Sequence, residues 1–143
     1  MTAIKFLYGA SNRLQAVVSW LASAHQDYNP ILVYTRSIEQ GEQIDSLLWT
    51  QEPTGFVPHC FADDDLASET PIIISHSLEN PLHDACLLNL TNEIPPHFSR
   101  FHHLIEIVSN AEEDKLPGRE RYRFYRDRGY PLESKDISRK VKQ

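Results

Sequence analysis

The chain has 143 residues, of which 41% are hydrophobic and 24% are charged, so it is long enough for one domain with a substantial core. The formal net charge of −6 excludes a protein that coats nucleic acid with its whole surface, and two cysteines exclude a disulfide framework. No apolar run reaches the length of a membrane span and no signal-peptide pattern opens the chain. We therefore expect no membrane contact and a reducing intracellular compartment.

The first third of the chain alternates apolar strands with amphipathic helices. Asn12 or the serine before it can cap the first helix, and Ser37-Ile-Glu-Gln40 is a capping box that begins the second. A β-α-β-α order is typical of a parallel sheet covered by helices. The predicted elements are strands at residues 4–8 and 31–34 and helices at residues 12–24 and 37–49.

The rest of the chain predicts more strands and one further helix. An acidic loop over residues 110–114 precedes a basic helix that begins near Lys115. Gly129 suits the left-handed position after the last helical turn, and Pro131 prevents the helix from continuing. The further extended segments are expected at residues 56–61, 71–75, 85–90 and 103–108.

These elements predict an α/β fold with a single doubly wound domain over residues 1–131. Its mainly parallel sheet would carry helices on both faces, in a Rossmann-like arrangement without a nucleotide loop. Residues 132–143 are expected to form a basic C-terminal tail that is loose at its end.

Charge is distributed unevenly along the chain. Residues 1–114 hold 4 Lys and Arg against 16 Asp and Glu, a net charge of −12. Residues 115–143 hold 10 against 4, a net charge of +6. Such asymmetry indicates an anionic partner for the basic part of the chain.

The basic helix concentrates its cations on one face. At 100° per residue its Lys and Arg row falls within about 80°, with a tyrosine at its edge, while Phe124 and Tyr125 can hold the helix to a core. Guanidinium groups beside an aromatic ring suit carboxylate or phosphate, although a solvated charged face has the same pattern. The predicted binding residues are Lys115, Arg119, Tyr122, Arg123 and Arg126.

A second patch is apolar and follows the second predicted helix. Large side chains clustered at a helix end and in the loop after it can form a protein-binding face, or they can cover the edge of the sheet. The residues of this patch are Trp49, Phe56, Val57 and Pro58.

Sequence patterns for catalysis, nucleotides and metals are weak. None of the five glycines has the spacing of a phosphate-binding loop, and no G-x-S-x-G motif is present. The pair His83 and Cys86 lacks the second close pair that structural zinc requires, and one acidic run over residues 63–65 is more typical of a soluble surface. We expect no cofactor, no metal and no enzymatic activity.

Three stretches resemble the chi subunit family of bacterial DNA polymerase III, which is part of the clamp-loader assembly. They are Asp45-Ser-Leu-Leu-Trp49, Phe56-Val-Pro-His59 and Arg119-Glu-Arg-Tyr-Arg-Phe-Tyr-Arg126 followed by Gly129. The resemblance covers essentially the whole chain and implies a doubly wound fold without nucleotide chemistry, in the bacterial cytoplasm.

The resemblance also implies two partners. The psi subunit would dock near Trp49, Phe56, Val57 and Pro58. The acidic C-terminal tail of single-stranded DNA-binding protein would bind Lys115, Arg119, Tyr122 and Arg123, beside Arg126 of the same row. The expected function is a non-catalytic replisome adaptor that contacts nucleic acid mainly indirectly. The alternatives are an α/β nucleotide-binding enzyme and a direct single-stranded nucleic-acid binder.

Overall fold

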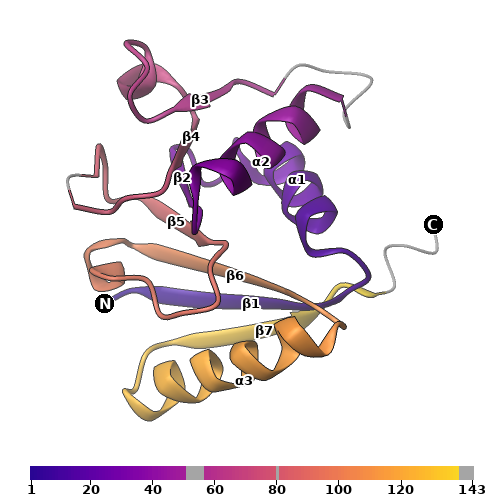
Figure 1. Cartoon of the computed structure of the whole chain (residues 1–143). Helices are drawn as coiled ribbons and strands as arrows, with labels where there is room; N and C mark the ends of the chain where they lie inside the picture. Colours follow the sequence, from indigo (N-terminus) through magenta and orange to yellow (C-terminus); the bar gives the residue numbers. More distant parts are fainter. Residues whose placement is uncertain (51–56, 80, 139–143) are drawn as a thin grey trace.

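The computed structural model describes residues 1–50, 57–79 and 81–138, which form one seven-stranded sheet in the order β3-β4-β2-β5-β6-β1-β7 (Figure 1). Every strand pair in this sheet is parallel, as predicted for a doubly wound α/β domain. The strands are β1 (Ala3–Ala10), β2 (Ile31–Tyr34), β3 (His59–Phe61), β4 (Ile72–Ser75), β5 (Cys86–Asn89), β6 (His103–Ser109) and β7 (Leu132–Asp136). The helices are α1 (Arg13–Ala24), α2 (Ile38–Thr50) and α3 (Glu112–Asp127), with short 3₁₀ turns η1 (Ala67–Glu69) and η2 (Phe98–Arg100).

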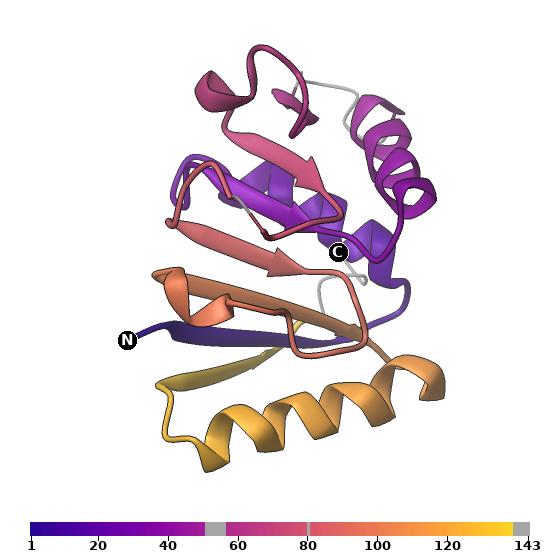
Figure 2. The same cartoon turned by 60° about the vertical axis from the view of Figure 1, so that its left-hand side comes forward.

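Alternate residues of the central strands face two separate cores. In β4, Ile72 and Ile74 belong to the core with α1 and α2, whereas Ile73 belongs to the core on the opposite face, which also contains Tyr125 of α3. The burial of both faces explains why these strands read as continuous apolar runs. Figure 1 and Figure 2 show α3 alongside β6, β1 and β7, at the end of the sheet remote from β3.

The predicted starts of the first two helices are confirmed. The side chain of Asn12 accepts a hydrogen bond from the backbone of Gln15 at 3.0 Å and caps α1. Ser37 Oγ accepts from the backbone N–H of Gln40 at 3.1 Å, and Gln40 Oε1 accepts from Arg36 N at 2.9 Å. The capping box therefore forms, with its return bond one residue earlier than usual.

The sheet continues beyond the boundary expected at residue 131. Residues 132–136, expected in the basic tail, form β7, which pairs in parallel with β1 and places Leu132 beside Ile4. Only Leu132 of this strand packs against a core, so β7 is held mainly by backbone hydrogen bonds at the edge of the sheet. The end of the expected tail, residues 139–143, lies outside the described residues.

Candidate functional site: the basic face of helix α3

Helix α3 begins earlier than the sequence predicts. Its first turn holds Glu112, Glu113 and Asp114, the residues expected in an acidic loop, and carboxylates there stabilise the positive end of the helix dipole. The hydroxyl of Ser109 donates to Asp114 and accepts from the backbone of Ala111 at 3.2 Å, so the end of β6 fixes the start of the helix.

The predicted end of α3 is confirmed. Gly129 has φ +82°, a left-handed conformation that a side chain would disfavour. Its N–H donates to Arg126 O at 3.0 Å, and the N–H of Tyr130 donates to Tyr125 O at 3.3 Å. These two bonds form a Schellman motif, which satisfies carbonyl groups that the end of the helix leaves free.

One face of α3 packs closely on β6. Gly118 lies inside the helix, where a Cβ atom would come within 3.1 Å of both Cγ atoms of Val108. Tyr125 is fully buried, and its ring lies 5.2 Å from that of Phe98 and 6.0 Å from that of Phe6. The expectation that Tyr125 anchors the helix is therefore confirmed, and the glycine permits the close approach.

A buried charged network fixes the rotation of α3 about its axis. The fully buried carboxylate of Glu106 in β6 accepts from Arg121 Nε at 3.1 Å, from Tyr125 Oη at 2.7 Å and from Asn89 Nδ2 at 3.0 Å. Burial, and then the adjacent carboxylate, raises the pKa of Tyr125, so its hydroxyl remains a donor. Within the described part of the chain, Arg121 Nη1 is buried without a hydrogen-bond partner. No local pattern in the sequence indicates this pair, because its two residues lie on different elements.

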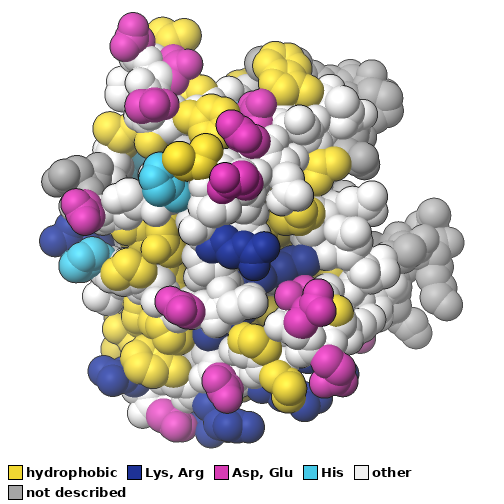
Figure 3. Space-filling model, in the orientation of Figure 1, with side chains coloured by type: hydrophobic (Ala, Val, Ile, Leu, Met, Phe, Trp, Pro, Cys, Tyr) yellow, Lys and Arg dark blue, Asp and Glu magenta, His cyan; other side chains and the backbone are white. Residues whose placement is uncertain are grey.

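The flank of α3 beside its buried face carries the predicted row. Arg119, Arg123 and Arg126 are exposed, and Lys115 and Tyr122 are half-buried. At helical spacing of three and four residues, all five side chains belong to one side of the helix. On the surface in Figure 3, several Lys and Arg side chains lie along the lower edge, over α3, interspersed with Asp and Glu, and a further Lys and Arg patch lies at the centre of this face.

The cations of this row differ in their partners. Arg126 Nη2 lies 3.2 Å from Asp127 Oδ1, in an exposed ion pair. Among the described residues, Lys115, Arg119 and Arg123 form no ion pair. Three cations thus remain available to an anion, beside the ring of Tyr122.

The strands beside α3 border this row. The ring of Tyr122 packs edge-on against Phe6 of β1, with centroids 5.3 Å apart. Phe6 is in register with Ser134 of β7, and Tyr8, 46% exposed, is in register with Asp136. The edge of the sheet therefore runs next to the row, which the sequence did not predict because β7 lacks an apolar pattern.

The second predicted patch is only partly exposed. Trp49 is 59% exposed and stacks edge-on against His59, with ring centroids 5.3 Å apart. The two ring nitrogens of His59 lie 2.6 Å from Val57 O and 3.0 Å from Asp45 Oδ1. The imidazole is thus held from both sides beneath the indole.

Val57 is the exception in this patch. Val57 is 4% exposed and packs in the core with residues of α1 and α2, which fits the interpretation that this patch covers the sheet. Pro58 is half-buried, and Phe56 lies outside the described residues. The exposed part of the patch is therefore centred on Trp49.

Arg13 occupies the place where doubly wound folds bind nucleotides, outside the carboxyl ends of the strands. Its side chain is 10% exposed and donates to Ile107 O at 2.8 Å, Thr91 O at 3.0 Å and Asn92 Oδ1 at 3.0 Å. Burial lowers the pKa of Arg13. The guanidinium closes this crevice by joining the ends of β5 and β6.

In residues 1–50, 57–79 and 81–138, no three His, Cys, Asp or Glu side chains come together as a metal cluster. No helix in the same part of the chain has the length and apolarity to cross a membrane.

Fold and site define a class: a parallel α/β domain that presents a basic helix anchored by a buried ion pair. A family model described as "DNA polymerase III chi subunit, HolC" matches residues 1–133. The chain belongs to this family of replisome components. It is 28% identical over 129 residues to the DNA polymerase III subunit chi of Pseudomonas aeruginosa, covering 90% of this chain and 89% of that protein. It is 32% identical over 117 residues to the Haemophilus influenzae subunit chi, covering 81% of each.

Proposed function

We propose that this chain is a non-catalytic adaptor of the bacterial cytoplasm, which links the DNA polymerase III clamp-loader complex to single-stranded DNA-binding protein. In this proposal α3 grips the acidic C-terminal tail of that protein, and a separate surface centred on Trp49 binds psi. Family membership supports a role in the replisome, and the site geometry supports each contact separately.

The observation that carries the tail-binding proposal is a row of available cations on a rigid helix. Lys115, Arg119 and Arg123 have no ion-pair partner in the described part of the chain, and Tyr122 offers an aromatic wall beside them. Guanidinium groups bind carboxylates through two parallel hydrogen bonds, so a peptide rich in Asp with a free α-carboxylate suits this row. The buried pair of Arg121 and Glu106 keeps the row directed outward without further ordering on binding.

The psi-binding proposal depends on a single large exposed side chain. Exposed Trp residues seated on a well-packed neighbour are common energetic centres of protein interfaces. Trp49 has this environment, because the ring of His59 supports it and Val57 secures the loop below in the core. Phe56 and Pro58 adjoin it in sequence and stay in the proposal as neighbours of this centre.

A titration tests the tail-binding proposal against direct nucleic-acid binding. A fluorescent peptide with an acidic tail and a free α-carboxylate is added to the full chain, and a single-stranded oligonucleotide serves as competitor. We expect saturable binding that the oligonucleotide does not displace. Displacement of the peptide by the oligonucleotide would instead favour a nucleic-acid site on α3.

The Arg119→Ala variant assigns the binding to α3. Loss of one charge-assisted hydrogen bond should weaken peptide binding by more than about 1 kcal/mol. The matched control is Arg100→Ala, an exposed arginine of η2 outside the row. Equal affinity for the wild-type chain and the Arg119→Ala variant would contradict the assignment.

A further inference from the structure

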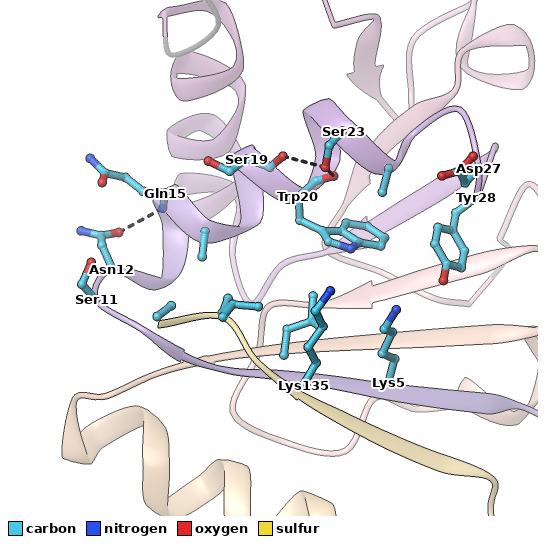
Figure 4. Close-up of a pocket in the computed structure, with 15 residues that line it drawn as sticks. Lys5, Ser11, Asn12, Gln15, Ser19, Trp20, Ser23, Asp27, Tyr28 and Lys135 are labelled. Atoms are coloured by element: carbon cyan, nitrogen blue, oxygen red, sulfur yellow. Dashed lines mark hydrogen bonds between the residues drawn. The ribbon is translucent and has the colours of Figure 1, made fainter. Parts of the chain in front are cut away.

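A groove lies between α1 and the strands β1 and β7, on the side of the sheet opposite α3 (Figure 4). It has a volume of about 480 Å³, which falls within the range of small-molecule sites. One wall is α1, and the floor is formed by Lys5 and Leu7 of β1, Lys135 of β7 and Ile137. Neither of the two partner surfaces proposed above includes this groove.

Two lysines of the floor project into the groove. Lys135 of β7 is in register with Leu7 of β1, two residues beyond Lys5, so both lysines face α1. Figure 4 shows their ammonium groups extending toward the rings of Trp20 and Tyr28. Among the described residues neither lysine has a hydrogen-bond or ion-pair partner. Two neighbouring cations that form no ion pair favour a doubly charged ligand.

The wall of the groove is aromatic and held in place. The rings of Trp20 and Tyr28 pack at 5.4 Å, and Tyr28 also packs edge-on against His103 at 5.2 Å. Both rings are partly buried against the core. Because these rings are already ordered, a planar ligand can stack on them at a small cost in entropy.

The remaining lining is mainly polar. Ser19, Ser23 and Gln15 of α1 add hydroxyl and amide groups beside the aromatic wall. Asp27 lines the groove beyond Trp20, and Glu133 is in register with Lys5. Like-charge repulsion from these two carboxylates would disfavour an extended polyanion more than a compact anion held at the lysines.

We propose that this groove binds one nucleoside monophosphate unit, with its base against Trp20 and its phosphate between Lys5 and Lys135. A planar heterocycle matches the aromatic wall, a phosphate matches the lysine pair, and sugar hydroxyls match the polar side chains of α1. This way of binding a nucleotide needs no glycine-rich loop, because side chains rather than backbone N–H groups hold the phosphate. It also leaves the crevice closed by Arg13 unused.

Calorimetric titration of the full chain with adenosine monophosphate tests this proposal. We expect saturable binding, and at least tenfold weaker binding of adenosine, which lacks the phosphate, and of ribose 5-phosphate, which lacks the base. No saturable binding at millimolar ligand would overturn the proposal. Equal binding of ribose 5-phosphate would also overturn it, since the aromatic wall would then have no role.

Variants locate the ligand. The double variant Lys5→Gln/Lys135→Gln should lower the affinity at least tenfold, and Lys135→Gln alone at least threefold, with circular dichroism to establish that each is folded. The matched controls are Arg100→Gln in η2 and Arg119→Ala on α3, which should bind the nucleotide like the wild-type chain. Loss of binding in Arg119→Ala, or retention in the double lysine variant, would contradict the site.

The source of the nucleotide is decided by a short single-stranded oligonucleotide. If the lysine substitutions weaken binding of the oligonucleotide more than binding of the monophosphate, the bound unit belongs to a nucleic-acid strand. If the oligonucleotide does not bind while the monophosphate does, the ligand is a free nucleotide. Either result supports the proposed chemistry, and neither depends on the tail-binding row.

Discussion

The basic row of α3 and the Trp49 surface are both proposed to bind a protein partner, but they are supported in different ways. Beneath the row, the carboxylate of Glu106 is fully buried and accepts three side-chain hydrogen bonds, two of them from α3 itself. Beneath Trp49, the support is one imidazole at the edge of the sheet, held by Asp45 and a backbone carbonyl. One surface is oriented by a buried ion pair, and the other by a ring contact with a hydrogen-bonded imidazole.

The difference shows how an acidic protein can present a cationic helix. A helix with cations on several sides could expose different residues by turning about its axis. Because Arg121 is paired with Glu106 inside the protein, a turned helix would leave an uncompensated charge in the core. The buried pair therefore specifies which face of α3 meets solvent, whereas the Trp49 surface needs no such constraint.

The largest expected effect comes from removing the buried carboxylate. Glu106→Ala leaves the Arg121 guanidinium buried without its counter-ion, which should destabilise the protein by about 3–5 kcal/mol. Urea unfolding followed by circular dichroism measures this change. The matched control is Asp127→Ala, which breaks the exposed pair with Arg126 and should change stability by less than about 0.5 kcal/mol. Similar effects of the two substitutions would show that the row does not depend on the buried pair.

A smaller loss of stability is expected in the Trp49 region. Val57→Ala removes two buried methyl groups and should lower the free energy of unfolding by about 2 kcal/mol. Leu66→Ala, at a position 61% exposed, is the matched apolar control and should be nearly neutral. If Val57→Ala left stability unchanged but abolished psi binding, Val57 would be a contact residue rather than the internal support of the surface.

The smallest expected effect is on the pH dependence of stability and involves His83, which lies in neither surface. Burial lowers its pKa, and its Nδ1 accepts a hydrogen bond from Ala85 N at 3.1 Å, a bond that protonation removes. Just below pH 6.5 the unfolded chain then binds more protons at this site than the folded protein, so stability should fall as the pH is lowered. Unfolding curves of His83→Gln should show a weaker fall, and those of the exposed control His102→Gln should match wild type.

The features predicted correctly from the sequence are those set by short-range pattern. The cap at Asn12, the box at Ser37 and the stop at Gly129 each depend on a few neighbouring residues, and each forms in the structure. The exposed face of α3 was also predictable, because helical periodicity alone determines which side chains share a side.

The features that were missed depend on contacts between distant elements. Leu132 is the one residue of strand β7 that packs against the core. The strand forms because the edge of β1, more than a hundred residues earlier in the chain, is available for backbone pairing. The pair of Glu106 and Arg121 joins a strand to a helix, and no local pattern separates Arg121 from the exposed arginines beside it. The burial of Val57 likewise depends on its packing with α1 and α2, which the residues around it in the sequence do not indicate.

The most direct test of the account is a crossed titration with both partners. The wild-type chain, Arg119→Ala and Trp49→Ala are each titrated with the acidic tail peptide and, separately, with psi. We predict that Arg119→Ala weakens binding of the peptide by more than about 1 kcal/mol and leaves the affinity for psi unchanged. Trp49→Ala should weaken binding of psi and leave the affinity for the peptide unchanged. If either substitution weakened binding of both partners equally while the protein stayed folded, the two partners would not bind to independent surfaces.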